Sequence, residues 1–172
     1  MSKALTFELG RDHKADARRL RDAFGCFTTG VTVVTTRAPD GGPVGFTANS
    51  FASVSLDPPL ALVCVDLGAN SLPVLEAAGV FVVNVLHADQ QEIARRFTAK
   101  GGDRFRGLPL ETWRTGAPVI AGCMANFECE THHAFDAGDH RVFIGRIVKV
   151  RMDPDHQPLV FLRGGYCGVS PT

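Results

Sequence analysis

The chain has 172 residues, of which 45% are hydrophobic and 21% charged, and its 18 basic residues balance its 18 acidic residues. This length supports one domain with a sizeable core but is short for two. A net charge of zero gives no electrostatic argument for nucleic acid or an anionic membrane surface. The longest apolar runs, such as residues 80–86, are far shorter than a membrane span. We therefore expect no nucleic-acid partner and no membrane association.

The N-terminal residues are polar and mixed in charge, without the apolar segment and cleavage site of a signal peptide. We divide the chain into a polar tail at residues 1–15 and a single domain at residues 16–172. Five cysteines without a C-x-x-C pair favour reduced structural thiols, and therefore the cytoplasm, over a disulfide framework. We expect no metal site, because the adjacent His132 and His133 would point to opposite faces of a strand.

A helix is expected first. Residues 14–27 carry apolar side chains at helical spacing with charged residues on the other face, which predicts an amphipathic helix ending near Gly25 or Gly30. Short apolar and β-branched runs follow, separated by turn residues such as those at 39–42. The strands expected in this part are residues 31–36, 44–48, 53–55 and 60–65.

Two short helices should flank a buried strand. Ser71 fits the N-cap of the first helix and Gly79 fits its exit. Residues 80–86 are apolar except for Asn84, which predicts a buried strand with one amide in it. Residues 89–97 should form the second helix, because their first four residues have the spacing of a capping box.

The C-terminal half should be mostly strand. Residues 98–118 are rich in glycine, proline and charge, which predicts a long surface excursion. Strands are expected at 125–135 and 141–152 around a tight turn, and a closing strand at 158–166. Seven or more short strands joined mainly by turns favour a closed or partly closed antiparallel barrel over a doubly wound sheet.

No established catalytic motif is present: the G-x-G-x-x-G, P-loop, G-x-S-x-G and H-E-x-x-H patterns are all absent. Residues 45–64 instead interleave hydroxyl and amide side chains with apolar ones. Such a strand edge can offer hydrogen bonds to phosphates and a heterocycle, as in proteins whose cofactor carries its own reactivity. A half-buried strand with hydroxyl groups facing solvent is the alternative. The polar residues of this stretch are Thr47, Asn49, Ser50, Ser53 and Ser55.

Other polar residues allow two interpretations each. Ser71 would open a helix whose N-terminus suits a phosphate group, but an ordinary cap has the same pattern. Arg95, Arg96 and Lys100 are cations near the second short helix, and a solvated helix face explains them more simply than a ligand does.

Six segments share a pattern with a known family. They are T-G-V-T-V-V-T-T at 29–36, G-F-T-A-N-S-F-A-S-V-S-L-D-P-P-L at 45–60, N-S-L-P-V-L-E-A-A-G-V-F-V-V-N-V-L at 70–86, Q-E-I-A-R-R-F at 91–97, A-G-D-H-R-V-F-I-G-R-I-V at 137–148 and P-L-V-F-L-R-G-G-Y at 158–166. In this order they resemble the flavin reductase-like, FMN-binding split-barrel family. The resemblance is strongest to the short reductase components of two-component flavin monooxygenases.

The resemblance implies a mainly β fold, a six-stranded antiparallel split β-barrel with two or three short helices, acting as a homodimer. It implies reduction of FMN or FAD by NADH or NADPH, with reduced flavin diffusing to a separate monooxygenase. Two alternatives stay open. The flavin could be held tightly and reduce another acceptor, such as a ferric complex or a corrinoid, or the protein could be a non-catalytic flavin-binding module.

The resemblance also implies site residues. Thr47 to Ser50 would hold the flavin ring edge and ribityl chain, and Ser71 and Arg96 would lie at the phosphate end. His140 would face the nicotinamide as an orienting group, with a structural role at a turn as its alternative. The implied flavin-binding residues are Thr47, Ala48, Asn49, Ser50, Ser53, Ser55, Ser71, Asn84, Arg96 and Tyr166.

Overall fold

The structure is a computed structural model that describes residues 4–10, 13–99 and 101–169. Within these ranges the chain is mainly β, with three α-helices: α1 (His13–Phe24), α2 (Leu72–Ala78) and α3 (Gln91–Thr98). A short 3-10 helix, η1 (Ala88–Gln90), precedes α3. The strands are β1 Thr29–Gly30, β2 Thr32–Arg37, β3 Pro43–Ala48, β4 Ala52–Leu56, β5 Pro59–Asp66, β6 Val80–Val85, β7 Leu110–Thr112, β8 Pro118–Ile120, β9 Ala125–Ala137, β10 His140–Met152, β11 Val160–Leu162 and β12 Gly165–Cys167.

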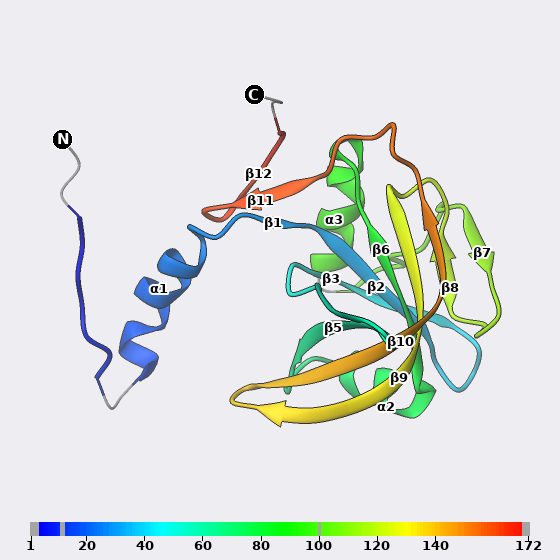
Figure 1. Cartoon of the computed structure of the whole chain (residues 1–172), viewed down its shortest axis with the longest axis horizontal. Coiled ribbons are helices and arrows are strands. Elements are labelled where there is room, and N and C mark those ends of the chain that lie inside the picture. Colours follow the sequence, from blue (N-terminus) through cyan, green and yellow to red (C-terminus); the bar gives the residue numbers. More distant parts are fainter. Residues whose placement is uncertain (1–3, 11–12, 100, 170–172) are drawn as a thin grey trace.

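Seven strands form one antiparallel sheet in the order β3-β2-β6-β9-β10-β5-β4. The sheet is strongly curved, so that β2 and β5 face one interior (Figure 1). Val34 on β2, Val63 on β5 and Phe143 on β10 belong to the same buried cluster. The expectation of six strands differs from this sheet of seven. Because β3 and β4 are its two edges, no hydrogen-bonded ladder among the described strands closes it.

The bend of the sheet is visible in the pairing of its longest strands. β10 loses regular register with β9 between Ile144 and Gly145, and again between Ile147 and Lys149. Bulges of this kind bend the strand and increase its twist. A second buried cluster, which includes Val31, Leu86 and Phe97, packs α3 against the outside of the curved sheet.

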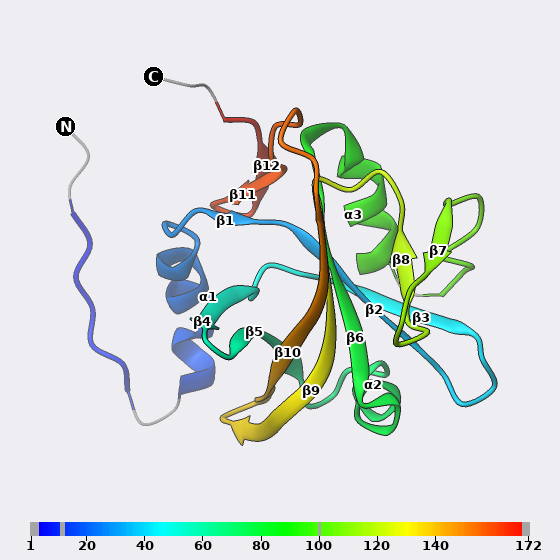
Figure 2. The same cartoon turned by 45° about the vertical axis from the view of Figure 1, so that its right-hand side comes forward.

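Helix α1 stands to one side of the sheet and is joined to it through β1 (Figures 1 and 2). Its position confirms the amphipathic helix expected before Gly25. It begins at His13, within the range assigned to the polar tail. None of the described helices is long and apolar enough to cross a membrane, and all five cysteines are free thiols.

Two expectations about the second half are wrong. The segment 98–118 is not wholly a surface excursion, because it ends in a β7–β8 hairpin whose residues 117–120 are buried against the sheet. The Thr35 hydroxyl donates to the Pro118 carbonyl there. The closing strand at 158–166 is instead a hairpin of β11 and β12, which turns at Arg163 and Gly164 and pairs with β1.

The helix starts also differ from expectation. The capping box is formed by His87 and Gln90, two residues before the expected one, because the His87 side chain accepts from the Asp89 N–H and the Gln90 side chain accepts from the His87 N–H. Ser71 occupies the N-cap position of α2, but its side chain makes no capping hydrogen bond.

Candidate functional site

A hollow of about 310 Å³ lies where the ends of β3 and β5 approach the start of β10 and the start of α2. Six of the residues expected from the sequence line it, although they come from three separate parts of the chain. The lining residues are Phe46, Thr47, Ala48, Asn49, Ser50, Cys64, Val65, Asp66, Ala69, Ser71 and His140. We call this the 47–50 hollow.

Ser50 holds the two sides of the 47–50 hollow together. Its hydroxyl accepts a hydrogen bond of 2.9 Å from the Cys64 N–H and donates one of 3.2 Å to the Cys64 carbonyl. Because β3 and β5 are not neighbours in the sheet, this side chain bridges the gap that the curved sheet leaves. The Ser50 hydroxyl is therefore engaged by the protein itself.

Asn49 is the polar side chain of this segment with the greatest freedom. It is exposed, and within the described residues its amide takes part in no hydrogen bond, whereas the hydroxyl groups of Thr47 and Ser50 are both engaged. A free amide can donate and accept at once, which matches the alternating groups on the edge of a heterocycle. Ala48 is only 9% exposed, and its carbonyl accepts a hydrogen bond of 2.8 Å from the Thr32 hydroxyl.

His140 begins β10 at the mouth of the 47–50 hollow. Its Nδ1 lies 2.6 Å from Oδ1 of Asp139, and this hydrogen bond is the largest cause that lowers the pKa of the Asp139 carboxyl. An ionised carboxylate only accepts, so Nδ1 carries the proton and Nε2 of a neutral ring is left as an acceptor. Across the ladder His140 faces Asp66, whose Oδ1 accepts from the Gly68 N–H.

The thiol of Cys64 also lines the 47–50 hollow. Burial raises its pKa, and a hydrogen bond with Ser50 opposes the rise only in part. The thiol is therefore protonated at neutral pH and is a poor nucleophile. The hollow offers hydrogen-bonding groups and apolar walls rather than a nucleophile paired with a base.

Asn84 lies away from the hollow, so its expected place among the flavin contacts needs correction. It is fully buried, with the amide nitrogen donating to the Val33 carbonyl at 2.9 Å. Its oxygen accepts from the Ile120 N–H at 2.9 Å and from the Asn126 amide at 2.8 Å. These bonds join β2, β8 and β9, and they leave no group of Asn84 exposed to a ligand.

Four further expected residues lie outside the 47–50 hollow. Ser53 and Ser55 are on the edge strand β4, where the Ser55 hydroxyl accepts from the Asp57 N–H at 3.2 Å. Arg96 on α3 donates to the Arg106 carbonyl at 2.8 Å. Tyr166, in contrast, lines an adjoining hollow of about 180 Å³ that shares Thr47 and Asn49 with the first.

The sequence analysis did not single out Phe46, Cys64, Val65, Asp66 or Ala69 as site residues. A signal existed for Asp66, because a polar residue directly after an apolar run marks the end of a buried strand, where ligand groups often lie. The apolar members carry no such mark. Phe46 and Val65 look like core residues in the sequence, and Val65 is one, since it is buried in the cluster against which Phe46 packs. They border the hollow because the ends of β3 and β5 approach each other there.

A family model described as "Flavin reductase like domain" matches residues 24–170. The chain therefore belongs to the flavin reductase-like family. The reductase subunit HsaB of a flavin-dependent monooxygenase from Rhodococcus jostii is 40% identical over 91% of this chain and 80% of its own length. SmoA, an FMN reductase (NADH) from Agrobacterium fabrum, is 44% identical over 88% of this chain and 85% of its own.

A solved structure of a flavin oxidoreductase has the same fold as this chain. The NADH:FAD oxidoreductase SgcE6 of Streptomyces globisporus, in complex with NAD and FAD fragments, superposes with a TM-score of 0.86. It is 40% identical to this chain, and the match covers 91% of this chain and 94% of that one. The expected family resemblance is thus confirmed.

Proposed function

We propose that this protein is an NAD(P)H-dependent flavin reductase that supplies reduced FMN or FAD to a partner monooxygenase. The observation that carries the proposal is the 47–50 hollow, which joins a polar strand end to apolar walls and offers no nucleophile. The relatives support the same activity, since they are named as reductase subunits and as an NADH-dependent FMN reductase.

The residues of the hollow fit a flavin. Phe46, which is half-buried, provides an apolar wall for a planar ring, and the free Asn49 amide provides paired donor and acceptor groups for its edge. The Ser71 hydroxyl, which makes no capping bond, would lie at the phosphate end. Tyr166 in the adjoining hollow would pack near the ring. When bound, the flavin supplies the group that accepts a hydride from the nicotinamide.

His140 acts in this proposal by orientation rather than by proton transfer. Its Nδ1–H is held by Asp139, so the ring is fixed and Nε2 can accept a hydrogen bond from an amide such as that of nicotinamide. Correct placement of two reacting rings contributes to rate because it removes the entropy cost of bringing them together.

We also propose that the protein acts as a homodimer in the cytoplasm and that its curved sheet is a split barrel. Val54 and Leu56 on the edge strand β4 are 44% and 95% exposed, and Val150 and Met152 at the end of β10 are 50% and 74% exposed. Exposed apolar side chains on an unpaired sheet edge are normally covered by another surface. A second copy of the chain would cover them, and Leu56→Asp should then shift the protein to monomers in light scattering.

Anaerobic absorbance at the flavin band tests the activity. The protein should bleach added FMN or FAD with NADH or NADPH at catalytic rather than stoichiometric rates. A preparation that is yellow when purified and turns over free flavin slowly would instead indicate a tightly held flavin with another acceptor. Bound flavin that neither nicotinamide bleaches would show a non-catalytic flavin-binding protein.

A further inference from the structure

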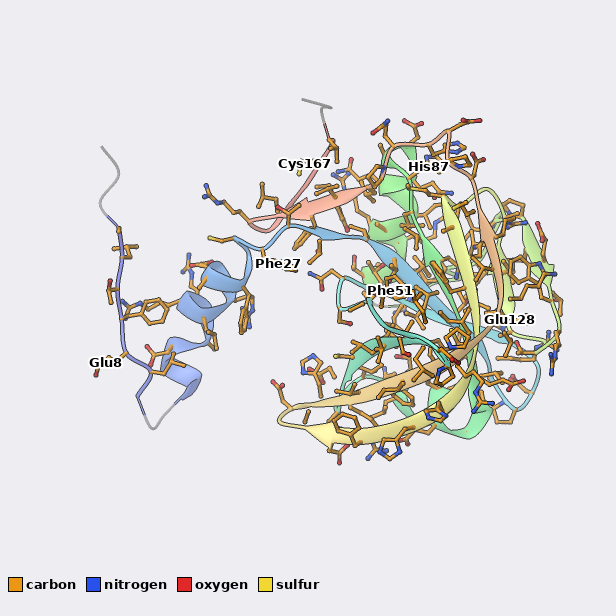
Figure 3. All side chains as sticks on the ribbon, in the orientation of Figure 1. Glu8, Phe27, Phe51, His87, Glu128 and Cys167 are labelled. Atoms are coloured by element: carbon orange, nitrogen blue, oxygen red, sulfur yellow. The ribbon has the colours of Figure 1, made fainter. Side chains whose placement is uncertain are left out.

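A second hollow, of about 520 Å³, adjoins the proposed flavin site. It lies between the end of α1, the loop that leads to β1, and the β11–β12 turn. Figure 3 places Phe27 in this loop, between α1 and the sheet. We call it the α1–β11 groove. Its volume is within the range of about 300–1,000 Å³ that small-molecule sites occupy.

The groove continues the proposed site rather than standing apart from it. Asn49 lines the 47–50 hollow, the Tyr166 hollow and the α1–β11 groove, and Phe161 lines the last two. Of these three cavities, Ser71 lines only the 47–50 hollow. The groove therefore extends from the Asn49 side of the proposed flavin site, away from the end assigned to the flavin phosphate.

The chemistry of the groove suits a nucleotide. Arg21 and Arg163 bring two guanidinium groups to it, against the single carboxylate of Asp22. Among the described residues, neither arginine forms an ion pair with a carboxylate. Guanidinium groups bind pyrophosphate oxygens with two hydrogen bonds at once.

Aromatic rings complete the groove. Phe24 and Phe27 are 69% and 77% exposed, and Phe161 joins them from β11. Exposed aromatic faces beside cations are the combination that binds a purine base next to its phosphates, because the base stacks while the charges pair.

The backbone at Arg163 is an independent observation. It has a φ of +48° and is the one non-glycine residue with positive φ in the described part of the chain. Its N–H donates to the Gly25 carbonyl at 2.8 Å, which fastens the turn to the end of α1. Glycine or asparagine adopts this conformation more readily than arginine. The positive φ therefore does not favour arginine at position 163. Non-glycine residues with such unusual backbone angles cluster at ligand sites.

We propose that the α1–β11 groove binds the adenosine diphosphate half of the nicotinamide donor. This inference rests on the proposed function, because it takes the nicotinamide to lie over the flavin beside His140 and Tyr166. From there the donor's pyrophosphate passes Asn49 to reach Arg21 and Arg163, and its adenine stacks among the phenylalanines. The adenylate of FAD would leave from the opposite, Ser71 end.

The test compares Arg163→Asn, and the double variant Arg21→Gln with Arg163→Asn, against the wild type by calorimetric titration with ADP, NAD⁺, FMN and FAD. Asparagine tolerates positive φ, so the turn should keep its shape. Arg18→Gln, an exposed change of the same charge on α1, is the matched control. We expect the double variant to bind ADP and NAD⁺ roughly tenfold more weakly, with FMN and FAD binding unchanged.

Kinetics add a second readout. The KM for NADH should rise in the variants, whereas the KM for reduced nicotinamide mononucleotide, which lacks the adenylate, should not. Unchanged ADP binding in the single and double variants would overturn the inference. Weakened FAD binding with unchanged NAD⁺ binding would also overturn it. A wild-type protein that binds neither FMN nor FAD would refute the proposed function instead, so the two failures are distinguishable.

Discussion

The hydroxyl group of Thr47 donates a hydrogen bond of 2.7 Å to the backbone carbonyl of Ala94. This bond fastens α3 to β3 at the edge of the 47–50 hollow. The two elements are in close contact nearby, since a Cβ at Gly45 would lie 2.8 Å from Cε1 of Phe97. The hydroxyl hydrogen of Thr47 is therefore used in a bond within the protein, and the hydroxyl oxygen can only accept a hydrogen bond from a ligand.

Thr47→Val should lower the free energy of unfolding by about 1 kcal/mol, because the Ala94 carbonyl loses its donor in a part-buried place. Urea denaturation measures this change. Thr47→Ser keeps the hydroxyl and should lose clearly less. If the valine variant is as stable as the wild type, the hydrogen bond to Ala94 does not stabilise the contact between α3 and β3.

His140→Ala should raise the KM for NADH and lower kcat, together by roughly tenfold in kcat/KM, which corresponds to one orienting hydrogen bond. Steady-state assays with fixed flavin measure both constants. Asp139→Asn leaves the imidazole but removes the carboxylate that holds Nδ1, so its effect should be smaller and in the same direction. His133→Ala, an exposed position on β9, is the matched control. An unchanged KM and kcat in His140→Ala would refute the assigned role.

The sequence predicts those features that depend on neighbours along the chain. β-branched runs and alternation located β2, β6 and the long β9–β10 pair, and spacing located α1. The 47–50 segment was also identified, because a dense row of small polar residues in an apolar stretch is a local pattern. Its meeting with Ser71 and His140 in one hollow followed only from the family resemblance.

Features that depend on distant partners were not predictable. Nothing near Asn84 in the chain shows that its amide will meet the backbone of Ile120 and the side chain of Asn126. The burial of β8 has the same cause, since residues 98–118 look solvated until Thr35 and the sheet cover their end. The histidine cap of η1 carries no strong sequence signal, because Ser, Thr, Asp and Asn are the preferred capping residues.

Gly145→Ala should destabilise the fold by about 1–3 kcal/mol, the usual cost of overpacking a core. A Cβ there would lie 2.5 Å from Cζ of Phe81 and 2.8 Å from Cβ of Cys129, and both neighbours are fully buried. Gly30→Ala is the matched control, because a Cβ at Gly30 meets nothing within 4 Å. Thermal unfolding measures both. Equal stability of the two variants would show that the strand shifts at its bulge to admit the methyl group.

His87 couples the stability of the fold to pH. Its Nδ1 accepts from the Asp89 N–H at 3.3 Å, and its ring centroid lies 4.3 Å from that of His156. Figure 3 shows it beside the segment that leads from β10 to β11. Burial is the main cause that lowers its pKa from about 6.5, and His156 adds to it, whereas Asp89, Asp153 and the Gly122 carbonyl oppose the shift.

Because the pKa of His87 is lower in the folded than in the unfolded state, the unfolded chain binds its proton more readily. His87 therefore does not destabilise the folded state above pH 6.5, which is the ordinary pKa of histidine. Stability is lost as the pH falls below this value and through the lower pKa that His87 has in the folded state.

We expect the melting temperature to be lower at pH 5.5 than at pH 7.5, roughly one unit either side of the ordinary pKa of histidine. His87→Asn keeps a capping side chain that does not titrate, so the gap between the two melting temperatures should narrow. His132→Asn, an exposed position on β9, should keep the wild-type gap. An unchanged gap in His87→Asn would contradict the assignment of this pH dependence to His87.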